Sequence, residues 1–227
     1  MPIATFINAA AVLIGGALGL LFKGRIPEQI SENIIRAIGL CVCIIGVSGA
    51  IKGDTMLLVA SLALGAFIGE LLNIEADLSR LGLWLQEKLS REDNSTFAEG
   101  FVTATLLFCV GAMTIVGSIE SGLKGDRSII LTKSILDGTA AMILASTLGY
   151  GVLFSAVVIL VYQGGLEFFA RYLQNVLTDA LITQISAVGS VMILAIGLNM
   201  VLKAKIRVAN LLPGLVFAVG YDYLFLL

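Results

Sequence analysis

The stretch IATFINAAAVLIGGALGLLF, residues 3–22, contains twenty residues and no charged side chain. An α-helix needs about 20 consecutive apolar residues to cross the hydrocarbon core of a bilayer, so this stretch predicts a transmembrane helix. No basic residue precedes it, which favours a retained helix over a cleaved signal peptide. The sequence predicts an all-α polytopic bundle with about eight spans, because similar stretches recur at about 33–51, 55–74, 97–119, 128–149, 150–170, 182–202 and 206–226.

Composition supports a protein that works within the lipid bilayer. Of the 227 residues, 58% are hydrophobic and 13% are charged, whereas soluble proteins carry about 25% charged residues. A formal net charge of −2, without a basic arm, argues against nucleic-acid binding. The chain has no histidine, so haem, zinc-hydrolase and Ser-His chemistry are not expected. No cofactor and no metal are predicted, and the three cysteines are interpreted as packing residues: Cys41, Cys43 and Cys109.

The distribution of lysine and arginine predicts the orientation in the membrane, because cytoplasmic loops are enriched in both residues. With eight spans, nine basic residues lie on one side and four on the other. The richer side is predicted to be cytoplasmic, which places both termini outside. The nine are Lys23, Arg25, Arg36, Arg80, Lys88, Arg91, Lys203, Lys205 and Arg207, and the four are Lys52, Lys124, Arg127 and Arg171.

One polar insertion, residues 75–95, separates the third and fourth stretches. Leucines recur in it at helical spacing beside Trp84, with charged residues around them. This pattern predicts an amphipathic helix lying on the cytoplasmic interface of the membrane. A connector and a docking element for partner proteins are both consistent with such a helix.

The first and last thirds of the chain share short motifs. Gly15-Gly16 is matched by Gly164-Gly165, and the pattern Ile-x-Ala-x-Gly occurs at 35–39 and at 185–189. Five spans separate the two copies, and an odd separation inverts the second copy. Inverted three-helix repeats are common in secondary transporters, although apolar helices can also resemble one another by chance. The predicted division is 1–74 for the first repeat, 75–96 for the interfacial helix, 97–149 for a central helix pair and 150–227 for the second repeat.

Asp137 is the strongest candidate for a functional residue. It lies near the middle of the fifth stretch, where an aspartate costs about 2.5–3.5 kcal/mol to insert. Lys133 lies one turn earlier on the same face. Two interpretations remain open: a pathway for a solute or ion, or a self-neutralising pair with a structural role.

The fourth stretch carries a polar face that could line such a pathway. If this stretch is one continuous helix, Glu99, Thr103, Thr114 and Ser118 fall within about 100° of arc, together with Ser121. Gly111 marks a weak point where the helix could open. The alternative is that the hydroxyl groups bond back to their own helix.

Polar residues in the last two stretches suggest further sites. Pro213 predicts a kink, because proline cannot donate to the carbonyl of Ala209, and Asn210 could satisfy that group. Asn199 is a further candidate for the pathway, although structural roles are equally consistent for both asparagines and for Asn8. Three glutamates lie near the ends of the stretches, where an interfacial position costs little: Glu70, Glu120 and Glu167.

Several longer motifs resemble a known bacterial multipass family, domain of unknown function (DUF) 554. They are FVTATLLFCVG (101–111), TKSILDG (132–138) and GVLFSA (151–156), and INAA (7–10) and IRVANLLP (206–213) also fit. The resemblance covers essentially the whole chain and implies a bacterial inner-membrane location, but no activity. Relatives are expected to carry proline at the position of Ala112, which would sharpen the break next to Gly111.

These observations favour a transporter or permease that moves a small solute or ion, and the chain is not expected to be an enzyme. The pathway would include Asp137, Lys133 and the polar face of the fourth stretch. The alternative is a scaffold or regulatory membrane protein that binds partners through residues 75–95. Small residues on single helix faces, such as Gly15-x-x-x-Gly19, allow close helix packing and suggest a homodimer.

Overall fold

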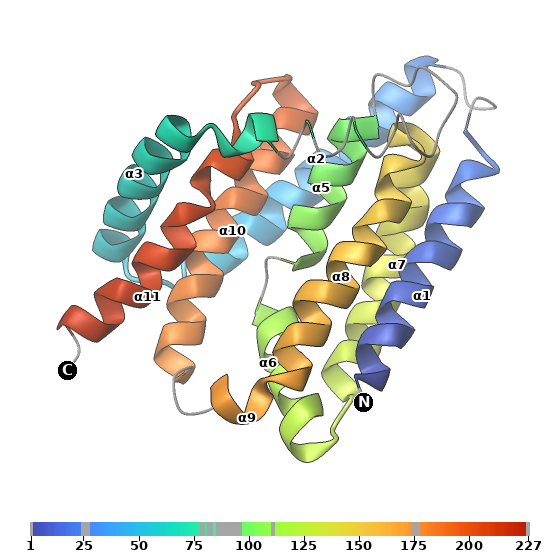
Figure 1. The fold of residues 1–227 in the computed structure, drawn as a ribbon. Coiled ribbons are helices and arrows are strands. Elements are labelled where there is room, and N and C mark those ends of the chain that lie inside the picture. Colours follow the sequence, from blue (N-terminus) through green and yellow to red (C-terminus); the bar gives the residue numbers. More distant parts are fainter. Residues whose placement is uncertain are drawn as a thin grey trace. The chain divides into compact units, whose positions relative to one another are not determined.

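A computed structural model describes residues 2–23, 28–77, 80, 84, 97–109, 112–173 and 178–225. Within these ranges the chain forms helices and no β-strand (Figure 1). Most of the helix predicted over residues 75–95 lies outside the described residues. The elements are α1 (Ile3–Leu20), α2 (Glu28–Ala50), α3 (Thr55–Leu72), α5 (Phe97–Cys109), α6 (Ala112–Lys124), α7 (Ser128–Leu148), α8 (Gly151–Phe168), α9 (Ala170–Leu173), α10 (Asp179–Leu202), the 3-10 helix η1 (Val208–Leu211) and α11 (Pro213–Phe225).

The prediction of an all-α polytopic membrane protein is confirmed. Six described helices are long and apolar enough to cross a membrane: α1, α2 from Glu32 onward, α3, α7, α8 and α10. Helices α5 and α6 add a seventh span if they are counted as one broken span, with a bend of 57° between them. The eighth predicted stretch contains a shorter apolar segment, Val208–Gly220. A total of eight spans therefore stays a prediction.

Local sequence determines several helix ends. Asp54 begins α3, because its side chain accepts a hydrogen bond from the backbone N–H of Leu57 at 2.9 Å. Thr178 does the same for α10, accepting from Leu181 at 3.1 Å. Gly149 separates α7 from α8 with φ +84°, a conformation that strongly favours glycine. The fifth and sixth stretches are therefore two distinct helices.

The helix break predicted at Pro213 takes the form of a boundary between two helices and not of a kink within one. The chain leaves η1 at Leu211, and Pro213 is the first residue of α11. Proline is well tolerated at this position, because the first N–H groups of a helix have no partner within the helix. Asn210 does not bond the carbonyl of Ala209 either; its Oδ1 accepts from the backbone N–H of Glu75 at 2.7 Å.

Contacts within the chain divide it into two compact units. Unit 1 comprises residues 1–31 and 79–176, and unit 2 comprises residues 32–78 and 177–227. Each predicted repeat is thereby shared between the units. Its first helix, α1 or α8, lies in unit 1, and its other main helices lie in unit 2. The compact units therefore differ from the predicted repeats, whose boundaries stay a prediction.

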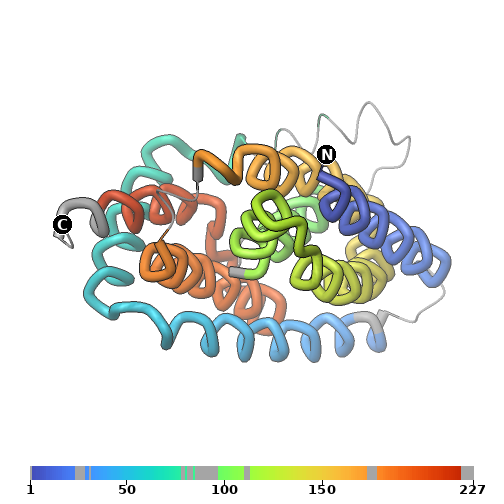
Figure 2. Tube along the Cα trace, turned by 90° about the horizontal axis from the view of Figure 1, so that it is seen from below, coloured from blue at the N-terminus to red at the C-terminus, as the bar shows by residue number. Residues whose placement is uncertain are grey.

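In unit 1, α1 packs along α7 and also contacts α8 (Figure 2). Glycines make the close approach of α1 to α7 possible. A Cβ on Gly15 would overlap the carbonyl oxygen of Gly138, and a Cβ on Gly19 would overlap that of Met142. The small-residue faces predicted for close packing are thus used within unit 1. Their use in a homodimer stays a prediction.

In unit 2, α2 packs antiparallel to α10, and α3 packs antiparallel to α11. Gly39 of α2 lies against Met200 of α10, and Gly46, further along α2, lies against Leu194, which comes earlier in α10. The two helices therefore run in opposite directions. In the second pair, Gly65 lies against Gly214. A small apolar core joins α3, α10 and α11 through Leu57, Val188 and Ala218.

Replacing Gly15 with alanine should destabilise unit 1. The new methyl group would overlap the backbone of α7, and overpacking of this kind costs about 1–3 kcal/mol. Gly165→Ala is the matched control, because a Cβ on Gly165 meets no atom within 4 Å and alanine favours a helix. The midpoint of thermal unfolding in detergent should fall for Gly15→Ala and be unchanged or higher for Gly165→Ala. Equal midpoints for both variants would contradict the packing of α1 on α7.

Candidate functional site: a buried polar network in unit 1

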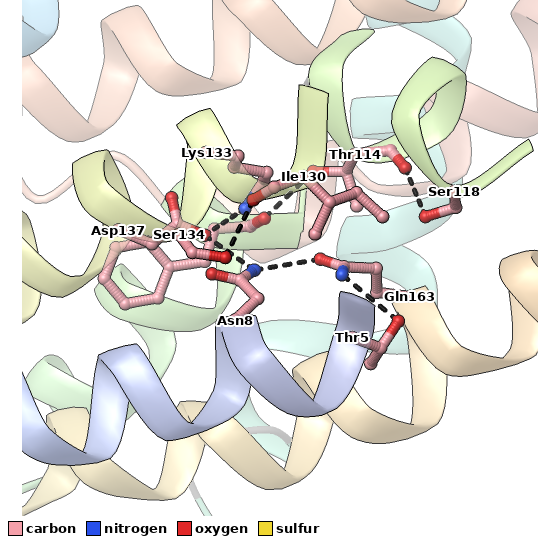
Figure 3. Close-up of polar contacts among 10 residues, drawn as sticks. Thr5, Asn8, Thr114, Ser118, Ile130, Lys133, Ser134, Asp137 and Gln163 are labelled. Carbon is pink, nitrogen blue, oxygen red and sulfur yellow. Dashed lines mark hydrogen bonds and ion pairs between the residues drawn. The ribbon is translucent and has the colours of Figure 1, made fainter. Parts of the chain in front are cut away.

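Four helices of unit 1 contribute side chains to one continuous chain of hydrogen bonds, here called the buried polar network. Figure 3 shows the part of it that runs from Lys133 and Asp137 through Asn8 and Gln163 to Thr5. All of its members are at most 7% exposed. They are Thr5 and Asn8 from α1, Ser121 from α6, Lys133 and Asp137 from α7, and Gln163 and Glu167 from α8.

The centre of the network is the ion pair between Lys133 and Asp137. The two side chains lie one helical turn apart on the buried face of α7, and the ammonium group of Lys133 donates to Asp137 Oδ2. Asn8 Nδ2 donates to the same oxygen at 3.0 Å. Asp137 lies near the middle of α7, which is a predicted membrane span, so the buried ion pair lies about halfway along that span.

Two amide side chains carry the network from α7 towards the N-terminal end of α1. Asn8 Nδ2 also donates to Gln163 Oε1 at 2.9 Å, and Gln163 Nε2 donates to Thr5 Oγ1 at 3.2 Å. Asn8 Oδ1 is buried and has no hydrogen-bond partner. The network therefore contains one unpaired acceptor, next to Asp137.

Glu167 ends the network near the C-terminus of α8. Its Oε2 accepts from Thr5 Oγ1 at 2.7 Å and from the backbone N–H of Thr5 at 3.3 Å, and its Oε1 accepts from Ser121 Oγ at 2.7 Å. Thr5 lies in the first turn of α1, where backbone N–H groups lack helical partners and a carboxylate is favoured.

The formal charges of the network do not cancel. Lys133 contributes +1, and Asp137 and Glu167 contribute −1 each, which leaves −1 when both carboxyl groups are ionised. A buried uncompensated charge is costly in a low-dielectric interior. This excess charge distinguishes the network from a self-neutralising pair.

The polar face predicted for the fourth stretch is divided by the bend between α5 and α6. Thr114 is buried, and its hydroxyl donates across the break to the carbonyl of Phe108 at 3.1 Å. Ser118 bonds back to the carbonyl of Thr114, as the alternative interpretation predicted. On α5, Thr103 is half-buried and Glu99 is exposed. Gly111 lies outside the described residues, between the ends of the two helices.

The two predicted asparagines of the C-terminal region lie in unit 2 and bond to the backbone. Asn199 accepts from the N–H of Ile206 and donates to its carbonyl, both at 2.8 Å. Asn210 accepts from Glu75, whose carboxylate in turn accepts from the N–H of Ala209 at 2.8 Å. These contacts hold the chain between α10 and α11, so both asparagines have a structural role in unit 2.

Sequence reasoning missed Gln163 and Thr5, and it did not predict that Glu167 is buried in the protein interior. A signal for them exists in the spacing of polar residues. Thr5 and Asn8 lie three residues apart, and Gln163 and Glu167 lie four apart, so each pair occupies one face of an otherwise apolar helix. In the described part of the chain, no group of three or more His, Cys, Asp and Glu residues could hold a metal ion.

Comparison with known proteins identifies the family. The family model described as "Protein of unknown function (DUF554)" matches residues 3–223. The chain is 32% identical over 216 residues to "Uncharacterized membrane protein YdfK" of Bacillus subtilis, covering 93% of this chain and 91% of that protein. It is 34% identical over 223 residues to "Uncharacterized protein YqgA" of Escherichia coli, covering 96% and 95%. No solved structure matches significantly. The chain belongs to the DUF554 family.

Proposed function

We propose that this protein is a transporter, and not an enzyme, that moves a small solute or ion through a site at Asp137. The observation that carries the proposal is the ion pair of Asp137 with Lys133, buried near the middle of an apolar helix and continued by hydrogen bonds to Glu167. Ionisable residues at such depth are costly, and in membrane proteins they commonly belong to ion or substrate pathways.

A purely structural role explains the network less well. A Lys–Asp pair can neutralise itself within one helix, and it needs no further polar partner on other helices. Here the pair is joined by Asn8 and Gln163, and the chain of hydrogen bonds ends on a second carboxylate, Glu167. Polar groups from four helices are more than a single helix needs for insertion.

The break between α5 and α6 supports the same proposal. Broken helices are a recurrent feature of transporter sites, because the opened turn presents backbone groups to the transported species. The bend is 57°, and Thr114 spans it by donating to the carbonyl of Phe108. Both helices of the broken pair belong to the unit that contains the network.

We also propose that α1–α3 and the set α8, α10 and α11 are inverted repeats. Support comes from three helix pairs, α1 with α8, α2 with α10 and α3 with α11, because the two helices of each pair pack antiparallel. In the first pair Thr5 contacts Glu167, Asn8 contacts Gln163, and Gly16 lies against Leu153. An experimental structure tests this proposal: the two triplets should superpose after rotation about an axis in the membrane plane. A superposition that keeps both triplets in one orientation would contradict it.

The proposed location is the bacterial inner membrane, with both termini outside. The basis is the asymmetry of nine basic residues against four in the predicted loops. We predict that Ser90→Cys reacts with a membrane-impermeant thiol reagent only after the cytoplasmic face is opened. The background for this experiment is the variant with its three native cysteines replaced by alanine. Rapid labelling of the Ser90→Cys variant in intact cells from the periplasmic side would contradict the predicted orientation.

Uptake by proteoliposomes tests transport directly. Purified protein would be reconstituted and supplied with labelled choline, glutamate, glycine or sodium as probes of cationic, anionic, zwitterionic and inorganic cargo. Transport predicts that at least one probe enters faster than it enters protein-free liposomes, and that Asp137→Asn removes the difference. Equal entry into both kinds of vesicle for every probe would count against the proposal and favour a scaffold that binds partners through residues 75–95.

A further inference from the structure

Glu167 is the member of the buried polar network whose charge the ion pair does not neutralise. It is 6% exposed and is the only charged residue in the sequence of α8. Three groups donate to its carboxylate, and all three are uncharged: the N–H and hydroxyl of Thr5 and the hydroxyl of Ser121.

The charged residues on the neighbouring elements have other positions or partners. On α6, Glu120 and Lys124 pair with each other at 3.3 Å on the surface. On α7, Lys133 is paired with Asp137. On α9, Arg171 is exposed. Helix α1 contains no charged residue. Glu99 lies in the first turn of α5, next to Phe97, and Phe97 packs against Gly151 at the end of α8 that is opposite to Glu167. No described cation pairs with Glu167.

The surroundings of Glu167 can accommodate both the ionised and the protonated carboxyl group. The ionised form accepts from Thr5 and Ser121, as observed. A protonated Oε1 could instead donate to Ser121 Oγ after rotation of the serine hydroxyl, because a hydroxyl group can donate or accept. Oε2 could keep both hydrogen bonds from Thr5. Uptake of one proton therefore requires no rearrangement of the helices.

A metal cation fits this site less well than a proton does. Sodium and the larger cations need several oxygen ligands with free lone pairs. The oxygens of Glu167 already accept N–H and O–H donors, and the described residues offer no further carboxylate beside it. The one cation that neutralises this carboxylate without displacing its donors is H⁺.

We propose that the buried polar network binds one proton per cycle, that Glu167 is its proton-loading site, and that this proton is the ion coupled to transport. The inference rests on the transport function proposed above. A proton from water binds the Glu167 carboxylate, which changes the formal charge of the network from −1 to 0, and its release restores the charge. No other reactant is consumed.

The first arm of the test needs no solute. Infrared difference spectra of the reconstituted protein, recorded on acidification, should contain a carboxylic-acid C=O band that shifts in D₂O and exchanges slowly with solvent. This band should be missing from Glu167→Gln and present in Glu120→Gln, a matched control at a partly exposed glutamate on α6. A slowly exchanging band of the same intensity in Glu167→Gln would overturn the proposal, as would its absence from the wild type.

The second arm measures coupling with the probe found to enter wild-type proteoliposomes. If one proton accompanies each solute molecule, an inward gradient of one pH unit should raise accumulation by up to about tenfold. Glu167→Gln should lose this dependence on the gradient, and Glu120→Gln should keep it. If uptake does not depend on the pH gradient and the infrared band is absent, proton coupling is contradicted, whereas the proposed transport function is still supported. A Glu167 band in a protein that takes up no probe contradicts transport and leaves the proton site standing.

Discussion

Lys133→Met is expected to destabilise the protein by about 3–5 kcal/mol, the usual effect of removing one partner from a buried ion pair. The Lys133 side chain is 6% exposed and the Asp137 side chain 10%, so water cannot replace the lost ammonium group well. The variant would also make the formal charge of the buried polar network more negative, −2 instead of −1. Its midpoint of thermal unfolding in detergent should lie far below that of the wild type.

The companion variants make this expectation specific. Asp137→Asn changes the network charge from −1 to 0, and the asparagine oxygen can still accept from both Lys133 and Asn8, so a smaller loss of stability than that of Lys133→Met is expected. The double variant Lys133→Met with Asp137→Asn has the wild-type charge of −1 and should recover most of the stability that Lys133→Met loses. Equal losses of stability in the two single variants would contradict this expectation, because they would show that the net charge of the network does not determine its stability.

Asp137→Asn is expected to reduce uptake by more than about tenfold, a factor that corresponds to about 1.4 kcal/mol. The substitution keeps the shape of the side chain and its contact with Asn8, but it removes the charge and the ability to bind a proton. Insertion and folding should be retained. The measurement is the initial rate of probe uptake into proteoliposomes that contain equal amounts of folded protein. Uptake at the wild-type rate would exclude Asp137 from the pathway.

The sequence was sufficient to predict most of the helices, because each apolar stretch is as long as a membrane span. The predicted stretch at 128–149 corresponds to α7 (Ser128–Leu148), and the stretch at 55–74 corresponds to α3 (Thr55–Leu72). The eighth stretch was less accurate. Hydropathy treats residues 206–226 as one segment, whereas Pro213 begins a new helix after η1 and the long apolar run is divided.

The site was predictable only where its members share a helix. Lys133 and Asp137 are four residues apart, so their proximity follows from helical geometry. The bonds of Asn8 with Asp137 and Gln163 join residues that are 129 and 155 positions apart, and no local pattern reports such a contact. The burial of Glu167 was not predictable for the same reason, because only the contacts from Thr5 of α1 and Ser121 of α6 show it.

The predicted polar face is divided in the structure, because it was derived for one continuous helix; its role in a pathway stays a prediction. At 100° per residue, Glu99 and Thr114 would share a face, but the 57° bend between α5 and α6 removes that relation. Of this face, Ser121 is the residue that reaches the network, through Glu167. A break can be suspected from Gly111, whereas the direction of a bend depends on tertiary packing.

Uptake by the double variant Lys133→Met with Asp137→Asn tests the central claim most directly. The variant has the wild-type network charge and is expected to be stable, so a loss of uptake cannot be attributed to unfolding. If the Asp137 carboxylate takes part in transport, the double variant should be as inactive as Asp137→Asn alone. If the carboxylate only neutralises Lys133, removing both charges should be harmless. Wild-type uptake by the double variant would contradict a transport role for Asp137 and reduce it to a structural counter-ion.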